Sequence, residues 1–520
     1  MSKYKLTLPG KIAVFIVILG AAAAALYYTG SYKNLGINNI PGIKNLDSQN
    51  QAQNGSSQST NFENSTDAMD VSLDEWIGWK SIMDANGGLT TQKGSIYDQL
   101  GLKLNIHVID DATQSSNALI KGSLDAAGYT VNRYSFLYSK FSENNVPVSM
   151  AYITNSSTGG DGIIAKQGIN SINDLVNKKI AVPRFSEAQT LIEWLISKSS
   201  LTPDQVKQLR SNMVMFDTPD DAAKALFANQ VDAAATWQPY LSQAASATGY
   251  KVFFSTKSAT NLVLDGIVFR KDYMDSNREN VAKFIEGALK AQNVYKTDFK
   301  AIKASMSLFS TETDSNIKSM TDDATLANYS MNKQLFSGLA QTLYKDMSRI
   351  WKTIGENADE NTVNDAFDNS ILLSLEGKFQ DQVDNKPKFT EDDRSKAKQQ
   401  DDKQALLSQK LSINFDTNSA NIKPESFVDL NKFADTAKIL NNVILQIEGN
   451  TDNVGSIESN LKLSQDRANA VANYLHFAQG LDPSRFVIVG NGPNKPVAGN
   501  DTDAGKAANR RTDVYFKVVK

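Results

Sequence analysis

The sequence predicts two α/β domains in series behind an N-terminal transmembrane helix, and the second domain is small and of βαβαβ order. An apolar run that follows several lysines predicts the helix. Short β-type runs that alternate with helical runs predict the first domain at residues 71–375, and a denser alternation predicts the second at 405–520. A chain of 520 residues is also long for one compact domain.

The composition indicates binding rather than catalysis. Lys plus Arg (54) nearly balances Asp plus Glu (57), which disfavours a nucleic-acid partner. The chain has no cysteine, which excludes thiolate catalysis, disulfides, cysteine zinc sites and a lipid anchor on cysteine. Its two histidines, His107 and His476, occur in no metal-binding spacing. We therefore expect no catalytic residues, no metal and no cofactor.

Residues 1–30 are predicted to be a cytoplasmic N-terminus and a membrane anchor. Lysines precede the apolar run from Ile12 to Tyr28, and this basic flank places the N-terminus in the cytoplasm. A cleaved signal peptide is the alternative, because Ala21 to Ala25 offers small residues for cleavage. Under either interpretation the rest of the chain is exported. The apolar run contains no acidic residue, which argues against a direct role in ion conduction.

Two polar stretches separate the predicted parts. Residues 31–70 are predicted to be a disordered linker, because 16 of the 19 residues from Ser48 to Thr66 are Asn, Gln, Ser, Thr or Gly. Residues 376–404 are predicted to be a charged linker, which is either a solvated helix or disordered.

The middle segment predicts an α/β domain with largely parallel sheets. In such sheets, ligands bind at the carboxyl ends of strands and near helix N-termini. The β-type runs fall at 102–109, 146–154, 162–166, 179–183, 213–216 and 231–237, with helical runs at 188–197 and 220–228.

Three places near the predicted strand ends are candidate ligand contacts. Ser186 follows one strand and has Gln189 three residues later, which predicts a helix N-cap. This helix start is either only a cap or a place where free backbone N–H groups hold an anionic or polar group. Trp237 ends another strand, and a glycine-rich turn places Asp161 just before a third.

In this order, these segments resemble the solute-binding proteins of the nitrate, sulfonate, taurine and thiamine-precursor type that feed ABC importers. The resemblance covers about 300 residues and implies two α/β lobes that close on a small polar solute. The matching segments are LDEWIGW (73–79), SLDAAGYT (123–130), GGDGIIAK (159–166), KKIAVPRFSEAQTLIEWLI (178–196) and LFANQVDAAATWQPYL (226–241).

The resemblance implies a solute site but not the identity of the solute. Phe185 replaces the glycine that usually precedes the serine in this family, and Gln238 replaces a frequent glutamate. Asp161 and Glu187 favour a cationic ligand, whereas the Ser186 helix start favours an anion, and the two alternatives stay open. The candidate solute-binding residues are Trp79, Thr130, Asp161, Ser186, Glu187, Gln189 and Trp237.

The C-terminal segment places an arginine on an apolar helical stripe. Leu463, Arg467, Val471 and Leu475 recur every four residues in a predicted helix. A buried guanidinium needs partners, which are either structural or those of a ligand. A carboxylate at Asp452 together with this guanidinium would suit the ammonium and carboxylate of an amino-acid head group.

At these residues the segment resembles the OmpA-like peptidoglycan-binding domain over about 110 residues. The matching motifs are FDTNSANI (415–422), GNTDNVG (449–455), NLKLSQDRA (460–468) and NRR (509–511), and Asn450 replaces the common histidine of the second motif. The resemblance implies that Asp452 and Arg467 bind diaminopimelate of the stem peptide, with Thr451, Asn453 and Asn460 lining the pocket. Arg510 either contacts the ligand or anchors the loop.

Together these features predict a membrane-tethered, wall-anchored receptor of the cell envelope. It would bind peptidoglycan and a small-molecule solute, and present the solute to an ABC permease or another inner-membrane protein. The alternative is an accessory or stator-like component of a membrane complex, in which the first domain is a protein-interaction scaffold. An enzyme is disfavoured, although a pyrimidine-forming enzyme family shares the binding-protein fold.

Overall fold

The computed structural model describes residues 67–519 apart from 295–296, 380–388, 412 and 417. The predicted membrane helix, the linker at 31–66 and part of the second linker lie outside these residues. Among the described residues, no helix is both long enough and apolar enough to cross a bilayer.

The first domain is built on two sheets. The sheet of the first lobe has the order β11-β4-β10-β3-β1-β2, and that of the second lobe has the order β7-β6-β8-β5-β9. The strands of the first lobe are β1 (Met69–Leu73), β2 (Leu104–Val108), β3 (Ala126–Thr130), β4 (Val148–Ser157), β10 (Leu264–Arg270) and β11 (Ala324–Leu326). Those of the second lobe are β5 (Asp161–Lys166), β6 (Ile180–Pro183), β7 (Met213–Phe216), β8 (Ala233–Trp237) and β9 (Tyr250–Ser255).

The chain crosses between the lobes twice, first between β4 and β5 and then between β9 and β10. Because β10 returns into the first sheet between β3 and β4, it runs antiparallel to both. In the second lobe, β5 likewise runs antiparallel to β8 and β9. The prediction of largely parallel sheets is therefore wrong, since both sheets are mixed. The two crossings set the direction of these strands, and periodicity along the sequence does not report it.

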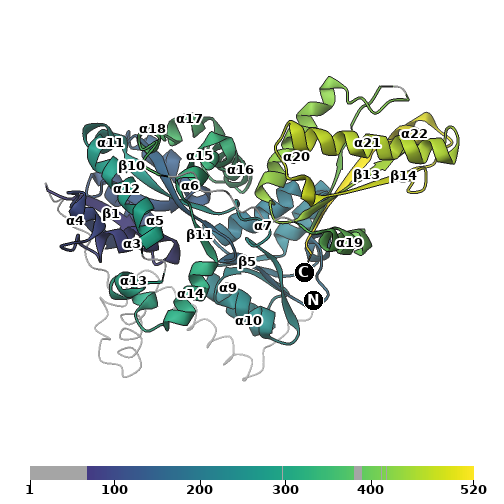
Figure 1. The fold of residues 1–520 in the computed structure, drawn as a ribbon. Helices are drawn as coiled ribbons and strands as arrows, with labels where there is room; N and C mark the ends of the chain where they lie inside the picture. The colour runs from purple at the N-terminus through teal and green to yellow at the C-terminus, as the bar shows by residue number, and fades with distance from the viewer. Residues whose placement is uncertain (1–66, 295–296, 380–388, 412, 417, 520) are drawn as a thin grey trace, which may run out of the picture. The chain divides into compact units, whose positions relative to one another are not determined.

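Helices cover both sheets (Figure 1). Those of the second lobe are α7 (Glu187–Lys198), α8 (Pro203–Ser211), α9 (Pro219–Phe227) and α10 (Tyr240–Ser246). Those of the first lobe are α3 (Lys80–Asn86), α4 (Ile96–Gln99), α5 (Ala112–Lys121), α6 (Val131–Glu143), α11 (Lys271–Ser276), α12 (Arg278–Val294), α13 (Lys300–Ser305), α14 (Asp314–Asp322), α15 (Tyr329–Gln334), α16 (Ala340–Thr353), α17 (Val363–Ala366) and α18 (Ser370–Leu373).

Helix α16 ties the two lobes together. It packs against both α6 and α7, and its Trp351 donates from the indole to the backbone oxygen of Asn132 at 2.8 Å. Asn132 also donates to the hydroxyl of Thr190 on α7 at 3.0 Å. Trp194 and Trp351 are both buried. This seam packs the two lobes against each other.

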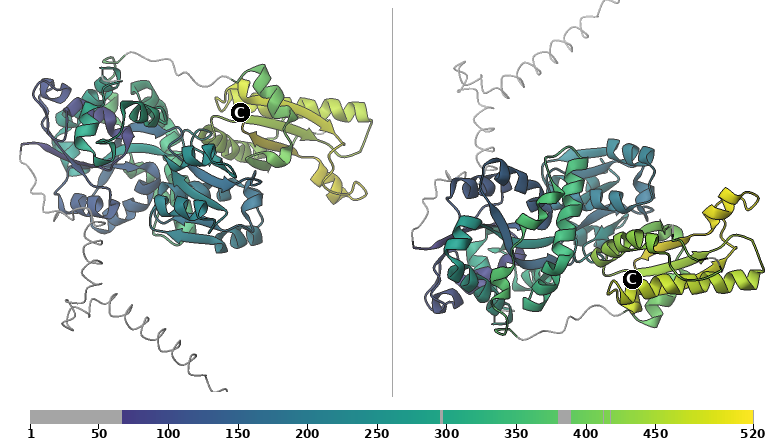
Figure 2. Two further views of the ribbon diagram at one scale, coloured as in Figure 1. Left: turned by 90° about the horizontal axis from the view of Figure 1, so that it is seen from below. Right: turned by 90° about the horizontal axis from the view of Figure 1, so that it is seen from above.

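The C-terminal domain is one four-stranded sheet of order β12-β15-β13-β14 with helices on both faces. Its elements are β12 (Leu407–Leu411), α20 (Phe427–Ile439), β13 (Ile444–Asn450), α21 (Ile457–Phe477), β14 (Phe486–Gly492), α22 (Asp503–Asn509) and β15 (Thr512–Lys517). The long helix α21 lies along the strands (Figure 2). The predicted βαβαβ order omits α22 and the central strand β15. The apolar run at 411–415 predicts the first strand there, but that strand, β12, ends at Leu411.

Part of the predicted charged linker is a helix of this domain. Helix α19 (Glu391–Gln399) packs on the face of the sheet opposite α21 (Figure 1). Its Ala397 is buried with Ile444 and Val487. The fully buried Nζ of Lys517 donates to the backbone oxygens of Ala397 and Gln400. Lys517 thus caps the carboxyl end of α19, where the helix dipole favours a cation.

Candidate functional site

The predicted solute residues of the first lobe lie at one edge of its sheet. Asp74 follows β1, and Thr130 ends the parallel strand β3. The antiparallel strand β10 begins at the same edge, so that Asp265 pairs with Thr130 on one side and with Asn155 of β4 on the other. Ligands bind at this edge in sheets of this kind.

The second lobe presents a matching edge. Asp161 begins β5 and pairs with Trp237 at the end of β8. Ser186 and Glu187 follow β6 and begin α7. Residues far apart in the sequence therefore meet where strands of both lobes end.

Ser186 is the N-cap of α7, as predicted. Its hydroxyl accepts from the backbone N–H of Gln189 at 3.2 Å and donates to the backbone oxygen of Pro183 at 2.8 Å. The side chain of Gln189 accepts from the backbone N–H of Phe185 at 2.7 Å. Two backbone donors of this helix start are therefore already satisfied within the chain.

Glu187 joins the two lobes. It accepts from the hydroxyl of Thr130 at 2.8 Å and from Nη2 of Arg133 at 2.9 Å. Thr130 in turn caps α6 by accepting from the backbone N–H of Arg133 at 3.0 Å. The side chain of Arg133 is 20% exposed and that of Glu187 is 9% exposed. A buried pair of this kind fixes the geometry of both lobes.

Three further carboxyls surround this pair. Burial raises the pKa of Asp161 to about 7, although the hydroxyl of Ser157 opposes this. Burial likewise raises the pKa of Asp74 to about 6, although the indole N–H of Trp79 lowers it. Burial raises the pKa of Asp265 well above its ordinary value, and the nearby carboxyls raise it further. We call Asp74, Arg133, Asp161, Glu187 and Asp265 the interlobe cluster.

The two predicted tryptophans have different environments. Trp79 is 1% exposed, and its indole N–H donates to Asp74, so that it supports the cluster from the core. Trp237 is 39% exposed and donates to Oδ1 of Asp220 at 3.2 Å.

Three members of the interlobe cluster, Asp74, Arg133 and Asp265, were not predicted from the sequence. Asp74 follows a strand and Arg133 lies in the first turn of the helix after another strand, and these positions are the only signal that the sequence offers for them. Asp265 could not be predicted, because its strand β10 belongs to the first lobe, whereas the preceding strand in the sequence, β9, belongs to the second lobe.

Phe185 occupies the backbone region that glycine favours. Its φ is 53°, and a bulky residue there is strained. Its ring is half exposed and stacks on Phe136 and Trp351, with ring centroids 5.9 and 6.4 Å apart. These contacts offset the strain and explain how phenylalanine is tolerated at this positive φ.

The second candidate site is a pocket of about 430 Å³ in the C-terminal domain. It is lined by residues that include Phe415, Asn450, Arg467, Arg510 and Arg511. The guanidinium of Arg467 lies 4.8 Å from the centre of the Phe415 ring, and its Nε donates to the backbone oxygen of Ser419 at 3.1 Å. Burial lowers the pKa of Arg467, and the Arg510 charge lowers it further. An anionic group in the pocket would relieve both costs.

Asp452 lies beside this pocket and pairs with Arg510 instead of Arg467. Nη1 of Arg510 lies 2.6 Å from its Oδ2, while the backbone N–H of Val454 donates to its Oδ1 at 3.0 Å. Arg510 therefore reaches the acidic loop, while Arg511 pairs with Asp513 and anchors the strand.

The other predicted loop residues differ in role. The amide of Asn460 donates to the backbone oxygen of Val454 at 3.0 Å and holds the loop. Thr451 is buried, and its Oγ1 has no hydrogen-bond partner within the described residues. Asn453 is exposed. Asn450, where histidine is common, donates to Oδ2 of Asp513 at 3.1 Å.

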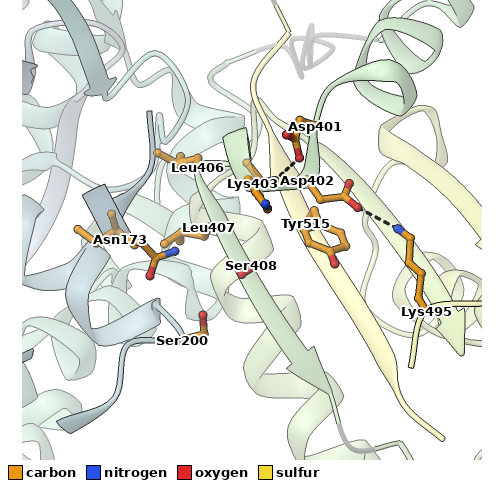
Figure 3. A pocket seen from close by; sticks show the side chains of 12 residues that line it. Asn173, Ser200, Asp401, Asp402, Lys403, Leu406, Leu407, Ser408, Lys495 and Tyr515 are labelled. Atoms are coloured by element: carbon orange, nitrogen blue, oxygen red, sulfur yellow. Dashed lines mark hydrogen bonds and ion pairs between the residues drawn. The ribbon is translucent and has the colours of Figure 1, made fainter. Parts of the chain in front are cut away.

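A buried ion network supports the sheet under this pocket. Glu448 is 1% exposed and accepts from Nζ of Lys495 at 2.8 Å, and from Asn491 at 2.8 Å. Lys495 also pairs with Asp402 at 2.9 Å (Figure 3). The pair of Lys495 and Glu448 therefore links the loop after β14 to β13.

Two family models match the chain. Residues 87–298 match the family described as NMT1/THI5 like, and residues 414–510 match the OmpA family. The two matches fall in the two folded domains, so the chain joins an NMT1/THI5-like domain to a C-terminal OmpA-family domain.

Individual proteins match in the same two places. Outer membrane porin F of Pseudomonas aeruginosa is 39% identical over 103 residues, which cover 20% of this chain and 29% of the porin. Peptidoglycan-binding protein ArfA of Mycobacterium tuberculosis is 38% identical over 102 residues, which cover 20% of this chain and 31% of that protein. The chain thus spans less than a third of the length of these curated relatives. The solved structure of the periplasmic aliphatic sulphonate binding protein SsuA from Escherichia coli aligns with a TM-score of 0.45 and 16% identity, over 57% of this chain and 97% of that one.

Proposed function

We propose that this chain, an NMT1/THI5-like domain fused to a C-terminal OmpA-family domain, is a solute receptor held at the bacterial cell wall. The N-terminal segment tethers it to the cytoplasmic membrane. The first domain captures a small polar solute and presents it to an inner-membrane partner such as an ABC permease. Holding the receptor between membrane and wall raises its local concentration at that partner.

The observation behind the receptor role is the meeting of strand ends from two lobes around buried, charged side chains. Glu187 and Asp161 come from one lobe, and Thr130 and Arg133 come from the other. Closure of two lobes around such groups removes a solute from water and strengthens each polar contact with it.

The wall-binding role is supported by the three charged groups at the C-terminal pocket. Arg467 and Arg510 offer two guanidinium groups to a carboxylate, and Asp452 offers an acceptor to an ammonium. A zwitterionic amino-acid head such as that of diaminopimelate meets both requirements. A relative that matches this domain is named as a peptidoglycan-binding protein.

Co-sedimentation with purified cell-wall sacculi tests the wall-binding role. We expect Asp452→Ala and Arg467→Ala each to abolish sedimentation. Arg467→Lys should also bind poorly, because it keeps the charge but loses the two-pronged geometry. Asp466→Ala is the matched control, because Asp466 precedes Arg467 on α21 and pairs only with the exposed Lys462. Full sedimentation by either alanine variant would exclude this site.

Native mass spectrometry of the gently purified chain, before and after denaturation, tests the receptor role. A discrete small mass that is released on unfolding is the expected result. An empty protein whose melting temperature does not respond to any solute would instead favour a protein-interaction scaffold in a membrane complex.

A further inference from the structure

The interlobe cluster contains four carboxyl groups and one guanidinium. Arg133 is the only cationic side chain in it, and Nη2 of Arg133 is already bound to Glu187. The charges of Asp74, Asp161 and Glu187 all act on Asp265, so these groups share one small region. Without a ligand, the region has an excess of carboxyls over cations.

One of these carboxyls has an oxygen without a partner. Asp265 is 4% exposed, and within the described part of the chain its Oδ2 has no hydrogen-bond partner. The indole N–H of Trp76 also acts on this carboxyl and lowers its pKa, and it donates to Oδ1 of Asn155 at 3.2 Å. Buried acceptors are nearly always satisfied, so this oxygen points to a missing donor.

The acidic groups of the same site disfavour an anion. An anionic group would meet the carboxyls of Asp161 and Asp265. The one guanidinium of the cluster is already paired with Glu187 through Nη2, although its Nε is buried without a hydrogen-bond partner within the described residues. At the start of α7, the backbone N–H groups of Phe185 and Gln189 are satisfied by side chains of the chain itself.

A metal ion is also a poor fit. Among the described residues, no three side chains of His, Cys, Asp or Glu lie close enough together to hold one.

We propose that the interlobe cluster binds a small organic cation, whose ammonium, guanidinium or amidinium N–H groups donate to Asp265 and Asp161. The inference rests on the proposed receptor function of this domain. It adds the charge class of the solute, which the sequence left open between cation and anion. The raised pKa values of both carboxyls fit this assignment, because a bound cation would favour their ionised form.

Titration of the full chain with matched probes tests the proposal. The cationic probes are ethylamine, putrescine and guanidinium, and the anionic probes are ethanesulfonate, succinate and nitrate. All five tryptophans of the chain lie between residues 76 and 351, so their fluorescence reports on the first domain. Calorimetry at pH 8 provides the affinity. We expect saturable binding of at least one cationic probe and of no anionic probe.

The variant Asp265→Asn keeps the shape of the side chain and removes the charge. It should fold at least as well as the wild type, because it removes a carboxyl that is buried without a partner, and it should weaken binding of the cationic probe by at least about tenfold. Asp275→Asn on α11 is the matched control, because Asp275 is exposed and should leave the affinity unchanged.

The outcomes distinguish the two levels of the proposal. Binding of an anionic probe without any cationic one would overturn the charge class and leave the receptor function standing. Equal affinity of Asp265→Asn and the wild type would overturn the assigned site. Binding of none of the probes, together with an empty protein by native mass spectrometry, would overturn both the charge class and the receptor function.

Discussion

The side-chain amide of Gln238 donates a hydrogen bond of 2.9 Å to Oδ2 of Asp323. Gln238 follows β8 in the second lobe, while Asp323 lies between α14 and β11 in the first. The oxygen of the same amide accepts from the hydroxyl of Ser242 at 2.9 Å. Only a group that both donates and accepts satisfies these two contacts, which explains why glutamine suits this position.

The variant Gln238→Glu should destabilise the first domain by about 1–2 kcal/mol at pH 8, because two carboxylates would then face each other. Repulsion raises the folded-state pKa of the pair, so the penalty is present above that pKa and disappears as the pH falls through it. Urea unfolding followed by tryptophan fluorescence at pH 8 and pH 5 measures this difference. Gln243→Glu, an exposed position on α10, is the control. A penalty independent of pH would contradict the explanation.

At Phe185, substitution by glycine should give a more stable protein than substitution by alanine, which is the reverse of the usual order. At its φ of 53°, glycine is unstrained, whereas alanine keeps the strain and loses the stacking on Phe136 and Trp351. We expect Phe185→Gly to be more stable than Phe185→Ala by about 1 kcal/mol in urea unfolding. If alanine is the more stable of the two, backbone strain is not what glycine relieves at this position.

Binding of an organic cation should strengthen as the pH rises. Asp161, with a pKa of about 7, and Asp74, with a pKa of about 6, are partly neutral below pH 6 in the empty protein. The charged groups that act on them are Arg133, Glu187 and Asp110, together with the hydroxyl of Ser157. Affinity for putrescine should therefore increase at least about tenfold between pH 5.5 and pH 8, and binding near pH 6.5 should release protons.

Calorimetry in two buffers of different ionisation enthalpy measures that proton release. A protonated diamine stays charged over the whole range, so the change in affinity reports on the protein. An affinity that does not change with pH would show that neither carboxyl receives the cation.

Loss of Lys495 should loosen the C-terminal sheet. In Lys495→Met the buried Glu448 keeps the amide of Asn491 but loses its cation. Because the side chain of Lys495 is 42% exposed, solvent screening limits the cost to about 1–3 kcal/mol. Faster hydrogen exchange of β13 amides should reveal it. Lys462→Met on the exposed side of α21 is the control, and equal protection in both variants would contradict the role of the network.

The local elements could be predicted because local sequence sets them. The Ser186 cap, the helix that follows it and the strand ends at Asp161 and Trp237 depend on nearest neighbours and on the alternation of apolar residues. Arg467 was recognised because a charge on an apolar stripe is anomalous within its own helix. The two family resemblances are confirmed by the matches at 87–298 and 414–510.

The order of the strands and the full set of site residues could not be predicted in the same way. β15 lies at the centre of its sheet although it is the last strand in the chain, and β10 enters the first sheet only after the chain has built the second lobe. The pairing of Asp452 with Arg510 was not predicted, because that arginine reaches the loop from the turn before β15. The joint action of Asp452 and Arg467 on a ligand stays a prediction.

The sequence by itself determined the two folded domains, their helix caps and the charged residues of the C-terminal loop and helix, since each follows from local pattern or motif. Only the tertiary structure showed which charged residues lie together between the two lobes. Asp74, Asp161 and Asp265 come from separate strands of two lobes, and they act as one group because chain crossings bring them into a region from which water is excluded. Contacts between residues far apart in the chain set that electrostatic environment.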